Sequence, residues 1–186
     1  MQARFIITLI VLWPFLVMGD VNWHKFGVTE GEKQTITIGV ASVTIGTRPV
    51  KGEWFPEDNL ILTVRGKGLT KSELGFSSSY GMGAIAIEGD ILLLKYGIGR
   101  GTAGARVEHI KAFSMSHSFD NSLDELFDVQ ITYWVESRDP KIASPDPIEY
   151  QIKIEKNRDY TTFTFWTPEP RKGIPSEKIV RLKNDG

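Results

Sequence analysis

The 186-residue chain has no cysteine and three histidines, and its charges nearly cancel, with 22 Lys and Arg against 23 Asp and Glu. The absence of cysteine excludes disulfides, thiolate metal sites and cysteine nucleophiles. The near-zero net charge excludes a strongly basic nucleic-acid binder and an acidic disordered tail. No H-x-x-x-H or H-E-x-x-H pair occurs, so the sequence predicts neither a metal site nor a cofactor.

Long apolar runs are also missing, except at the start of the chain. The fifteen residues from Phe5 to Gly19 carry no charge and follow a basic start. This run is short for a bilayer-spanning helix, and Pro14 weakens a helix there. Small residues at Val17 and Gly19 complete the pattern of a secretory signal peptide. We expect residues 1–19 to be removed and the body to be exported, periplasmic or secreted; an uncleaved N-terminal membrane anchor is the alternative.

What the sequence does contain is glycine, aromatic residues and alternation. The chain has 18 Gly, 9 Pro and 10 Phe, 5 Trp and 5 Tyr, a composition typical of a turn-rich β protein. Apolar and polar residues alternate, as in half-buried strands, at 34–40, 43–45, 60–64, 127–135, 148–155 and 160–166, and shorter apolar strands are expected at 84–87 and 91–96. We expect residues 20–186 to form one all-β domain, an antiparallel sandwich or small barrel of about seven to nine strands.

Some segments leave the local structure open. The alternation slips in phase after Val40, which suggests a bulge near Ala41. Residues 107–115 fit a strand or a short helix. Residues 175–182 fit a short C-terminal helix, with Pro175 at an early helical position, or a last strand. The Gly- and Ser-rich segment from 66 to 83 is expected to be a long loop.

Histidine and carboxylate residues supply the candidate catalytic set. His109, His117 and Asp120 are the residues from which a hydrolase site would be built. Ser, His and Asp lie together at 116–120, but a catalytic triad converges in space from separate elements, so adjacency does not predict one. No G-x-S-x-G motif is present.

A glycine-rich motif, G-x-G-x-x-G, occupies residues 99–104. A dinucleotide site would need a following helix and a further parallel strand, and residues 105–110 lack the apolar period of a good helix. We therefore interpret the motif as a connection between strands and expect no free dinucleotide partner.

Tryptophan and phenylalanine supply the candidate binding residues. Trp54 and Phe55 lie in an expected turn, and Trp134 lies on the polar face of the 127–135 strand. Trp166 follows Phe165, so one of the two must point away from the core. Exposed aromatic rings on a sheet stack on sugars or anchor a partner protein, although the second layer of a sandwich would also cover them.

Three segments share a pattern with a known family: the strand 91–99 with its Tyr-Gly pair, Val107 to Ile110, and the closing hairpin of Tyr150 to Ile154 with Thr164 to Pro168. On these segments, residues 84–166 resemble bacterial pleckstrin-homology-like domains. The resemblance implies a binding scaffold without catalytic residues.

Three functions remain open at this point. The first is an exported, non-enzymatic binding or interaction module whose partner is a protein or a cell-envelope glycan or lipid. The second is a secreted hydrolase that uses a histidine with a carboxylate. The third is a strand-adding subunit of an envelope assembly. The sequence does not fix the oligomeric state.

Overall fold

The computed structural model describes residues 21–29, 31–47, 60–66, 69–76, 82–99, 106–116, 122–133, 148–171 and 173–184. These residues contain fourteen strands and no helix. The strands are β1 (His24–Gly27), β2 (Lys33–Ile38), β3 (Ala41–Thr47), β4 (Leu60–Gly66), β5 (Leu69–Phe76), β6 (Met82–Glu88), β7 (Ile91–Gly99), β8 (Arg106–Ser114), β9 (Asp124–Gln130), β10 (Thr132–Tyr133), β11 (Ile148–Glu149), β12 (Gln151–Lys156), β13 (Tyr160–Trp166) and β14 (Glu177–Lys183).

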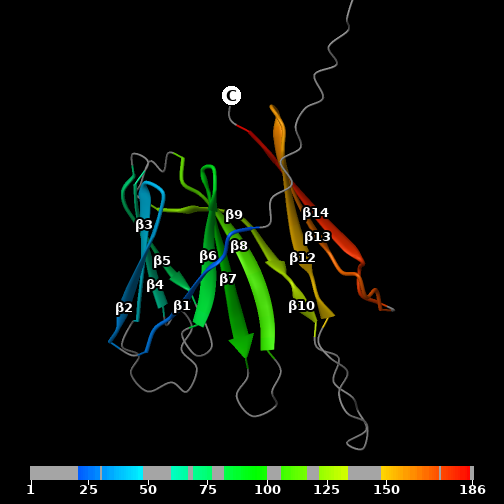
Figure 1. Cartoon of the computed structure of the whole chain (residues 1–186), viewed down its shortest axis with the longest axis horizontal. Helices are drawn as coiled ribbons and strands as arrows, with labels where there is room; N and C mark the ends of the chain where they lie inside the picture. The colour runs from blue at the N-terminus through cyan, green and yellow to red at the C-terminus, as the bar shows by residue number, and fades with distance from the viewer. Residues whose placement is uncertain are drawn as a thin grey trace, which may run out of the picture.

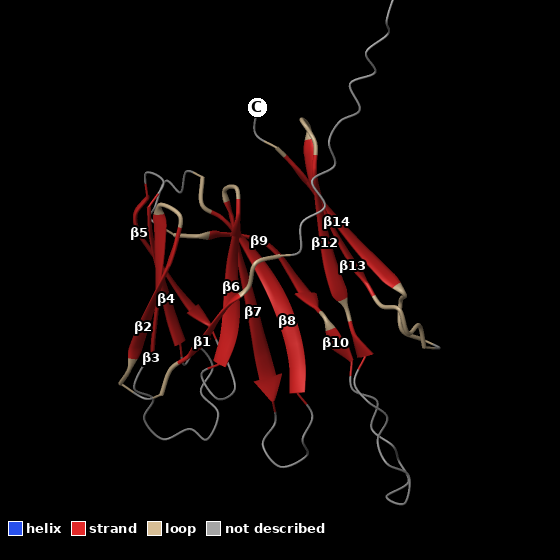
Figure 2. Ribbon diagram, viewed as in Figure 1, coloured by secondary structure: helices blue, strands red, loops and turns tan. Residues whose placement is uncertain are grey.

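The strands form three layers, as Figures 1 and 2 show. A central five-stranded sheet has the order β1-β6-β7-β8-β9. A four-stranded sheet, β2-β3-β4-β5, lies on one side of it, and a three-stranded sheet, β12-β13-β14, lies on the other. All strand pairs are antiparallel. The predicted all-β antiparallel sandwich is therefore confirmed, with a third layer added.

Strand β7 in the middle of the central sheet is buried on both faces along Leu92 to Leu94, and its sequence shows why. Ile91 to Leu94 is a continuous apolar run, as is Ala84 to Ile87 on the neighbouring strand β6. Leu92 and Leu94 belong to the core shared with the four-stranded sheet, whereas Leu93 belongs to the core shared with the three-stranded sheet. Successive side chains of a strand point to opposite faces, so a run without alternation is what a strand between two apolar layers requires.

One strand joins the central sheet to the three-stranded sheet. The Ile131 N–H donates to the Glu108 carbonyl on β8 at 2.8 Å, and the Ile131 carbonyl accepts from the Tyr150 N–H at 2.9 Å. Beyond Ile131 the chain pairs as β10 with β11, which leads directly into β12. Ile131 is therefore the corner at which the strand passes from one sheet to the next.

Two tight hairpins fix the register of neighbouring strands. Gly89 and Asp90 connect β6 to β7, as the sequence predicts, and Gly89 has a φ of 65°. Gly39 and Val40 connect β2 to β3, with Ile38 opposite Ala41 and a φ of 59° at Gly39. The expected bulge near Ala41 is therefore wrong, because the phase slip marks a two-residue turn, with Val40 exposed on it.

The structure corrects two further expectations, the loop at 66–83 and the number of strands, and settles the open alternatives at 107–115 and 175–182. Residues 177–183 form strand β14 rather than a C-terminal helix, since their alternating burial provides an apolar face for the neighbouring core. Part of the expected 66–83 loop is strand β5, which pairs with β4. Residues 106–114 form strand β8. The strand number exceeds seven to nine because bends divide long strands and because β1, β5 and β14 were not counted.

The expected signal peptide, residues 1–19, lies outside the described residues. Within the described ranges, no helix is long and apolar enough to cross a membrane.

Candidate functional site

Two of the residues singled out from the sequence lie in described strands, His109 on β8 and Trp166 on β13. The others lie outside the described residues; they are Trp54, Phe55, Trp134, His117 and Asp120. The structure therefore places one candidate catalytic residue and one candidate binding residue, and they lie on different sheets.

His109 lies on the face of the central sheet that turns toward the four-stranded sheet, and the side chains of this face change from apolar on β7 to polar on parts of β8 and β9. On β7 this face carries Leu92 and Leu94, which are fully buried under the four-stranded sheet. On β8 and β9 the same face carries Lys111 opposite Asp128, and His109 opposite Gln130. The face is apolar where the neighbouring layer covers it and polar where water reaches it.

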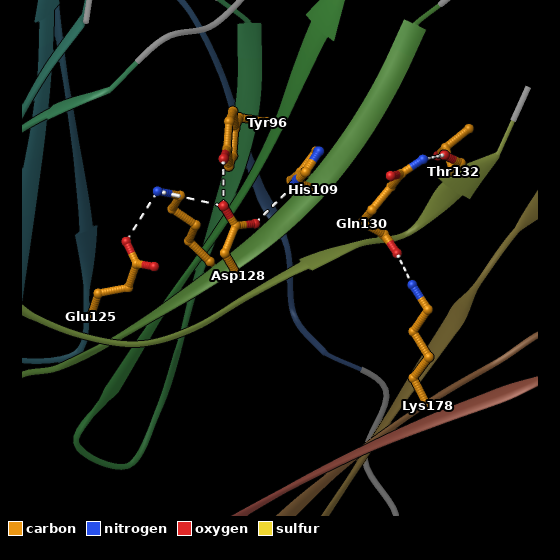
Figure 3. A network of polar contacts seen from close by, with 8 residues as sticks. Tyr96, His109, Glu125, Asp128, Gln130, Thr132 and Lys178 are labelled. Carbon is orange, nitrogen blue, oxygen red and sulfur yellow. Dashed lines mark hydrogen bonds and ion pairs between the residues drawn. The ribbon is translucent and has the colours of Figure 1, made fainter. Parts of the chain in front are cut away.

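Asp128 is the centre of the polar part of this face, as Figure 3 shows. Its Oδ1 lies 2.8 Å from Nδ1 of His109. Its Oδ2 accepts a hydrogen bond from the Tyr96 hydroxyl at 3.2 Å and lies 3.5 Å from Nζ of Lys111. The Lys111 ammonium also donates to Oε2 of Glu125 at 3.0 Å. One carboxylate thus connects three strands, β7, β8 and β9.

Burial and charge shift the pKa of two groups in this network. The Tyr96 ring is buried, and burial together with the nearby Asp128 carboxylate raises the pKa of its hydroxyl well above the ordinary value. Partial burial of Lys111 lowers the pKa of its ammonium, but hydrogen bonds and attraction from Glu125 and Asp128 outweigh this and raise the pKa. Tyr96 therefore stays a hydrogen-bond donor and Lys111 stays a cation at neutral pH.

The His109–Asp128 pair has part of the geometry of an acid–base catalyst. A carboxylate at Nδ1 fixes the orientation of the ring. Nε2 lies on the side of the ring away from Asp128, and no described residue hydrogen-bonds to it. The Tyr96 hydroxyl donates to Asp128 rather than to His109. The described residues hold no group of His, Asp and Glu arranged to bind a metal ion.

A second polar cluster lies at the corner where the strand changes sheets. Nζ of Lys178, on β14, donates to the carbonyl of Gln130 at 2.9 Å and lies 5.2 Å from the centre of the Tyr150 ring. The Gln130 amide donates to the Thr132 carbonyl at 2.9 Å (Figure 3). The chain bends at Ile131, where it passes from one sheet to the next. These contacts give the Gln130 and Thr132 carbonyls hydrogen-bond partners at the bend, so the cluster has a structural role.

Trp166 lies on the solvent face of the three-stranded sheet. Its neighbour Phe165 is fully buried in the core, so Trp166 points away from that core, between Gln151 and Glu177 on the adjacent strands. This outer face of β12-β13-β14 is defined by Gln151, Lys153, Glu155, Tyr160, Thr162, Thr164, Trp166, Glu177, Ile179, Arg181 and Lys183. Tyr160, at the opposite end of β13, is exposed, and the Arg181 guanidinium carbon lies 5.7 Å from the centre of its ring.

Sequence reasoning missed Asp128, because it paired His109 with carboxylates close in the chain. Asp128 is 19 residues from His109 and 32 from Tyr96, and strand pairing alone brings them together. The one indication of Asp128 in the sequence is its place among the polar residues that alternate with apolar ones at 127–135. That pattern is interpreted as the solvent-exposed face of a strand and does not by itself indicate a site.

No family model matches this chain, and neither a curated protein nor a solved structure matches it.

Proposed function

We propose that the protein is an exported, non-enzymatic binding module and that it recognises its partner through the outer face of β12-β13-β14. The single observation that carries this proposal is Trp166, a large, partly exposed aromatic side chain on the face of β13 opposite the buried Phe165. The export part of the proposal depends on the signal-peptide pattern of residues 1–19.

The side chains of this face favour a glycan over the other envelope partners. Trp166 and Tyr160 are six residues apart on one strand, which corresponds to about 20 Å at ~3.3 Å per residue. Thr162 and Thr164 lie between them and offer hydroxyls that donate and accept hydrogen bonds. Two flat aromatic rings separated by hydroxyls on a sheet suit an extended, hydroxyl-rich polymer. The resemblance to pleckstrin-homology-like domains also implies a binding scaffold.

A pull-down of the purified protein with its native cell-envelope fraction tests this function. We expect Trp166→Ala to weaken binding at least about tenfold, as for an aromatic anchor of a binding surface, and Trp166→Phe to retain part of it. Thr37→Ala, an exposed change on β2, is the matched control. Prior treatment of the fraction with glycosidases should abolish binding. Binding that survives Trp166→Ala in a folded protein contradicts the proposed surface, and loss after protease treatment alone identifies a protein partner instead.

A second function, hydrolysis, is favoured by the 2.8 Å contact between His109 and Asp128. In this function His109 acts as a general base through Nε2, with Asp128 orienting the ring. The test is a screen of ester, amide and glycoside substrates with the wild type, His109→Gln and Asp128→Asn. Hydrolysis that both changes reduce by about 100-fold or more supports this function. Absence of activity, or activity equal in all three proteins, rejects it.

A further inference from the structure

The outer edge of the three-stranded sheet is strand β14. Among the described residues β14 pairs only with β13, so its other side is an open edge (Figure 1). Such an edge presents unpaired N–H and C=O groups to any strand that approaches it. The residues along β14 determine which kind of strand can pair with this edge.

The register shows which residues present those groups. The Thr167 N–H donates to Ser176 O at 3.1 Å, and the Asn184 N–H donates to Asp159 O at 2.8 Å. Hydrogen-bonded pairs alternate with non-bonded pairs in an antiparallel ladder. Lys178, Val180 and Leu182 therefore direct their backbone groups toward β13. The residues that direct theirs outward are Glu177, Ile179, Arg181 and Lys183.

The side chains at these four positions are exposed, and they are complementary to a copy of themselves. Ile179 has 57% of its surface exposed, which is high for a large apolar residue on a strand. Glu177 and Arg181 lie two residues to either side of Ile179 and carry opposite charges. An antiparallel copy centred on Ile179 places Ile179 against Ile179 of the second copy. It also places each Glu177 opposite an Arg181, at two symmetric positions.

We propose that two copies of this chain pair antiparallel through β14, about a twofold axis at Ile179, and join their three-stranded sheets into one six-stranded sheet. Every outward backbone group of Glu177, Ile179 and Arg181 then gains a partner. Opposite charges that face each other across strands stabilise the pair, and Ile179 is covered by its counterpart. The contact is isologous, as a twofold dimer requires. It goes beyond the proposed function, because Trp166 lies on β13 and stays uncovered.

Charge reversal and charge exchange at Glu177 and Arg181 test the pairing, with sedimentation velocity of the purified full-length protein over a range of concentrations. We expect the wild type to dimerise. Glu177→Arg and Arg181→Glu should each weaken the dimer about tenfold or more, since each turns two attractive cross-strand pairs into repulsive ones. The exchange variant E177R/R181E should return the dissociation constant to within about threefold of the wild type, because the opposite charges again face each other.

Lys183→Glu is the control for register. In the proposed pairing Lys183 faces no Glu177, so we expect the change to leave the dissociation constant within about threefold of the wild type. A shift of the second copy by two residues would instead place Lys183 opposite Glu177. The proposal is overturned if the wild type is a monomer at all concentrations, or if the dimer tolerates both Glu177→Arg and Arg181→Glu. It is also overturned if E177R/R181E dimerises as weakly as the two single variants. A dimer that Lys183→Glu weakens more than any other change contradicts the proposed register. Circular dichroism and thermal melting verify that each variant is folded.

Discussion

The two halves of one face of the central sheet differ more than the two faces of the sheet do. Over β6 and β7 this face carries Ile85, Leu92 and Leu94, all fully buried against the four-stranded sheet. Over β8 and β9 it carries the half-buried network of Asp128, His109 and their neighbours. Both halves are antiparallel sheet, with one register shift in the β8–β9 pair between Ala112 and Phe113. The extent of the covering layer differs between them in parallel with the change from apolar to polar side chains. Where that layer ends, carboxylate, imidazole and ammonium groups stay partly exposed to water.

The other face of the central sheet, toward β12-β13-β14, stays apolar from β7 to β9. Leu93, Ile110 and Ala112 are buried against Phe163 and Phe165 of β13. There the apolar surface continues onto β9, because the Phe127 ring packs edge-on against both of these phenylalanine rings, with centroids 5.0 and 5.9 Å apart. β9 is thus apolar on one side and polar on the other, whereas β7 is apolar on both.

The largest expected effect comes from truncating β7 on either face. Leu92→Ala and Leu93→Ala should each lower the free energy of unfolding by about 2–5 kcal/mol, because each leaves a cavity in a fully packed core. Similar losses of unfolding free energy for Leu92→Ala and Leu93→Ala indicate that β7 lies between two apolar layers. In a two-layer sandwich only one of the two neighbouring side chains would be buried. Urea unfolding measures both losses. Val40→Ala, at a 77% exposed turn position, is the control and should change stability by less than about 0.5 kcal/mol. A near-neutral Leu93→Ala would contradict the third layer.

The next effect concerns the close packing of β1 on β6. A Cβ atom on Gly83 would lie 2.5 Å from the Lys95 carbonyl oxygen and 2.5 Å from Cζ of Phe26. Backbone on one side and a buried ring on the other leave little room to relax, so Gly83→Ala should cost about 1–3 kcal/mol. The matched control is Gly27→Ala on β1, where the added Cβ meets only Met82 Cγ at an ordinary 3.9 Å. Equal melting temperatures for the two variants would show that Phe26 of β1 does not pack closely against Gly83.

A smaller effect is expected in the polar half of the face. Asp128→Asn keeps the shape of the side chain but removes the charge that His109, Tyr96 and Lys111 share. Because Asp128 is 30% exposed, solvent screens much of this interaction, and we expect a loss of about 1 kcal/mol. Chemical denaturation at neutral pH measures it. A loss as large as that of Leu92→Ala would mean that the network belongs to the core.

The smallest effect is a pH dependence from Tyr96. Its hydroxyl has a raised pKa in the folded protein and an ordinary pKa near 10 in the unfolded chain. The folded state therefore binds more protons above pH 10, and stability must fall there as pH rises. Below that pH the contribution is complete. We expect the stability advantage of the wild type over Tyr96→Phe to shrink steadily as pH rises above about 10. An advantage that is constant with pH would place the hydroxyl in an ordinary aqueous environment.

Much of the fold could be predicted from local patterns. Leu60, Leu62 and Val64 alternate with polar neighbours, and all three are fully buried. The turn from β12 to β13 is predicted by Asn157, whose side chain accepts hydrogen bonds from the N–H groups of Asp159 and Tyr160 at 2.9 and 2.7 Å. β14 was ambiguous, because seven residues with two charged ends fit one short helix as well as one strand.

The amino-acid sequence alone specifies antiparallel strands in this chain, because a side-chain period of two and turn residues at fixed points are local properties. The meeting of Tyr96, His109 and Asp128 follows only from the three-dimensional fold, as does the position of β14 as a strand that, among the described residues, pairs with β13 alone. Those outcomes depend on strand order and register across 19 or more residues, and alternation specifies which face a residue takes but not which strand lies beside it.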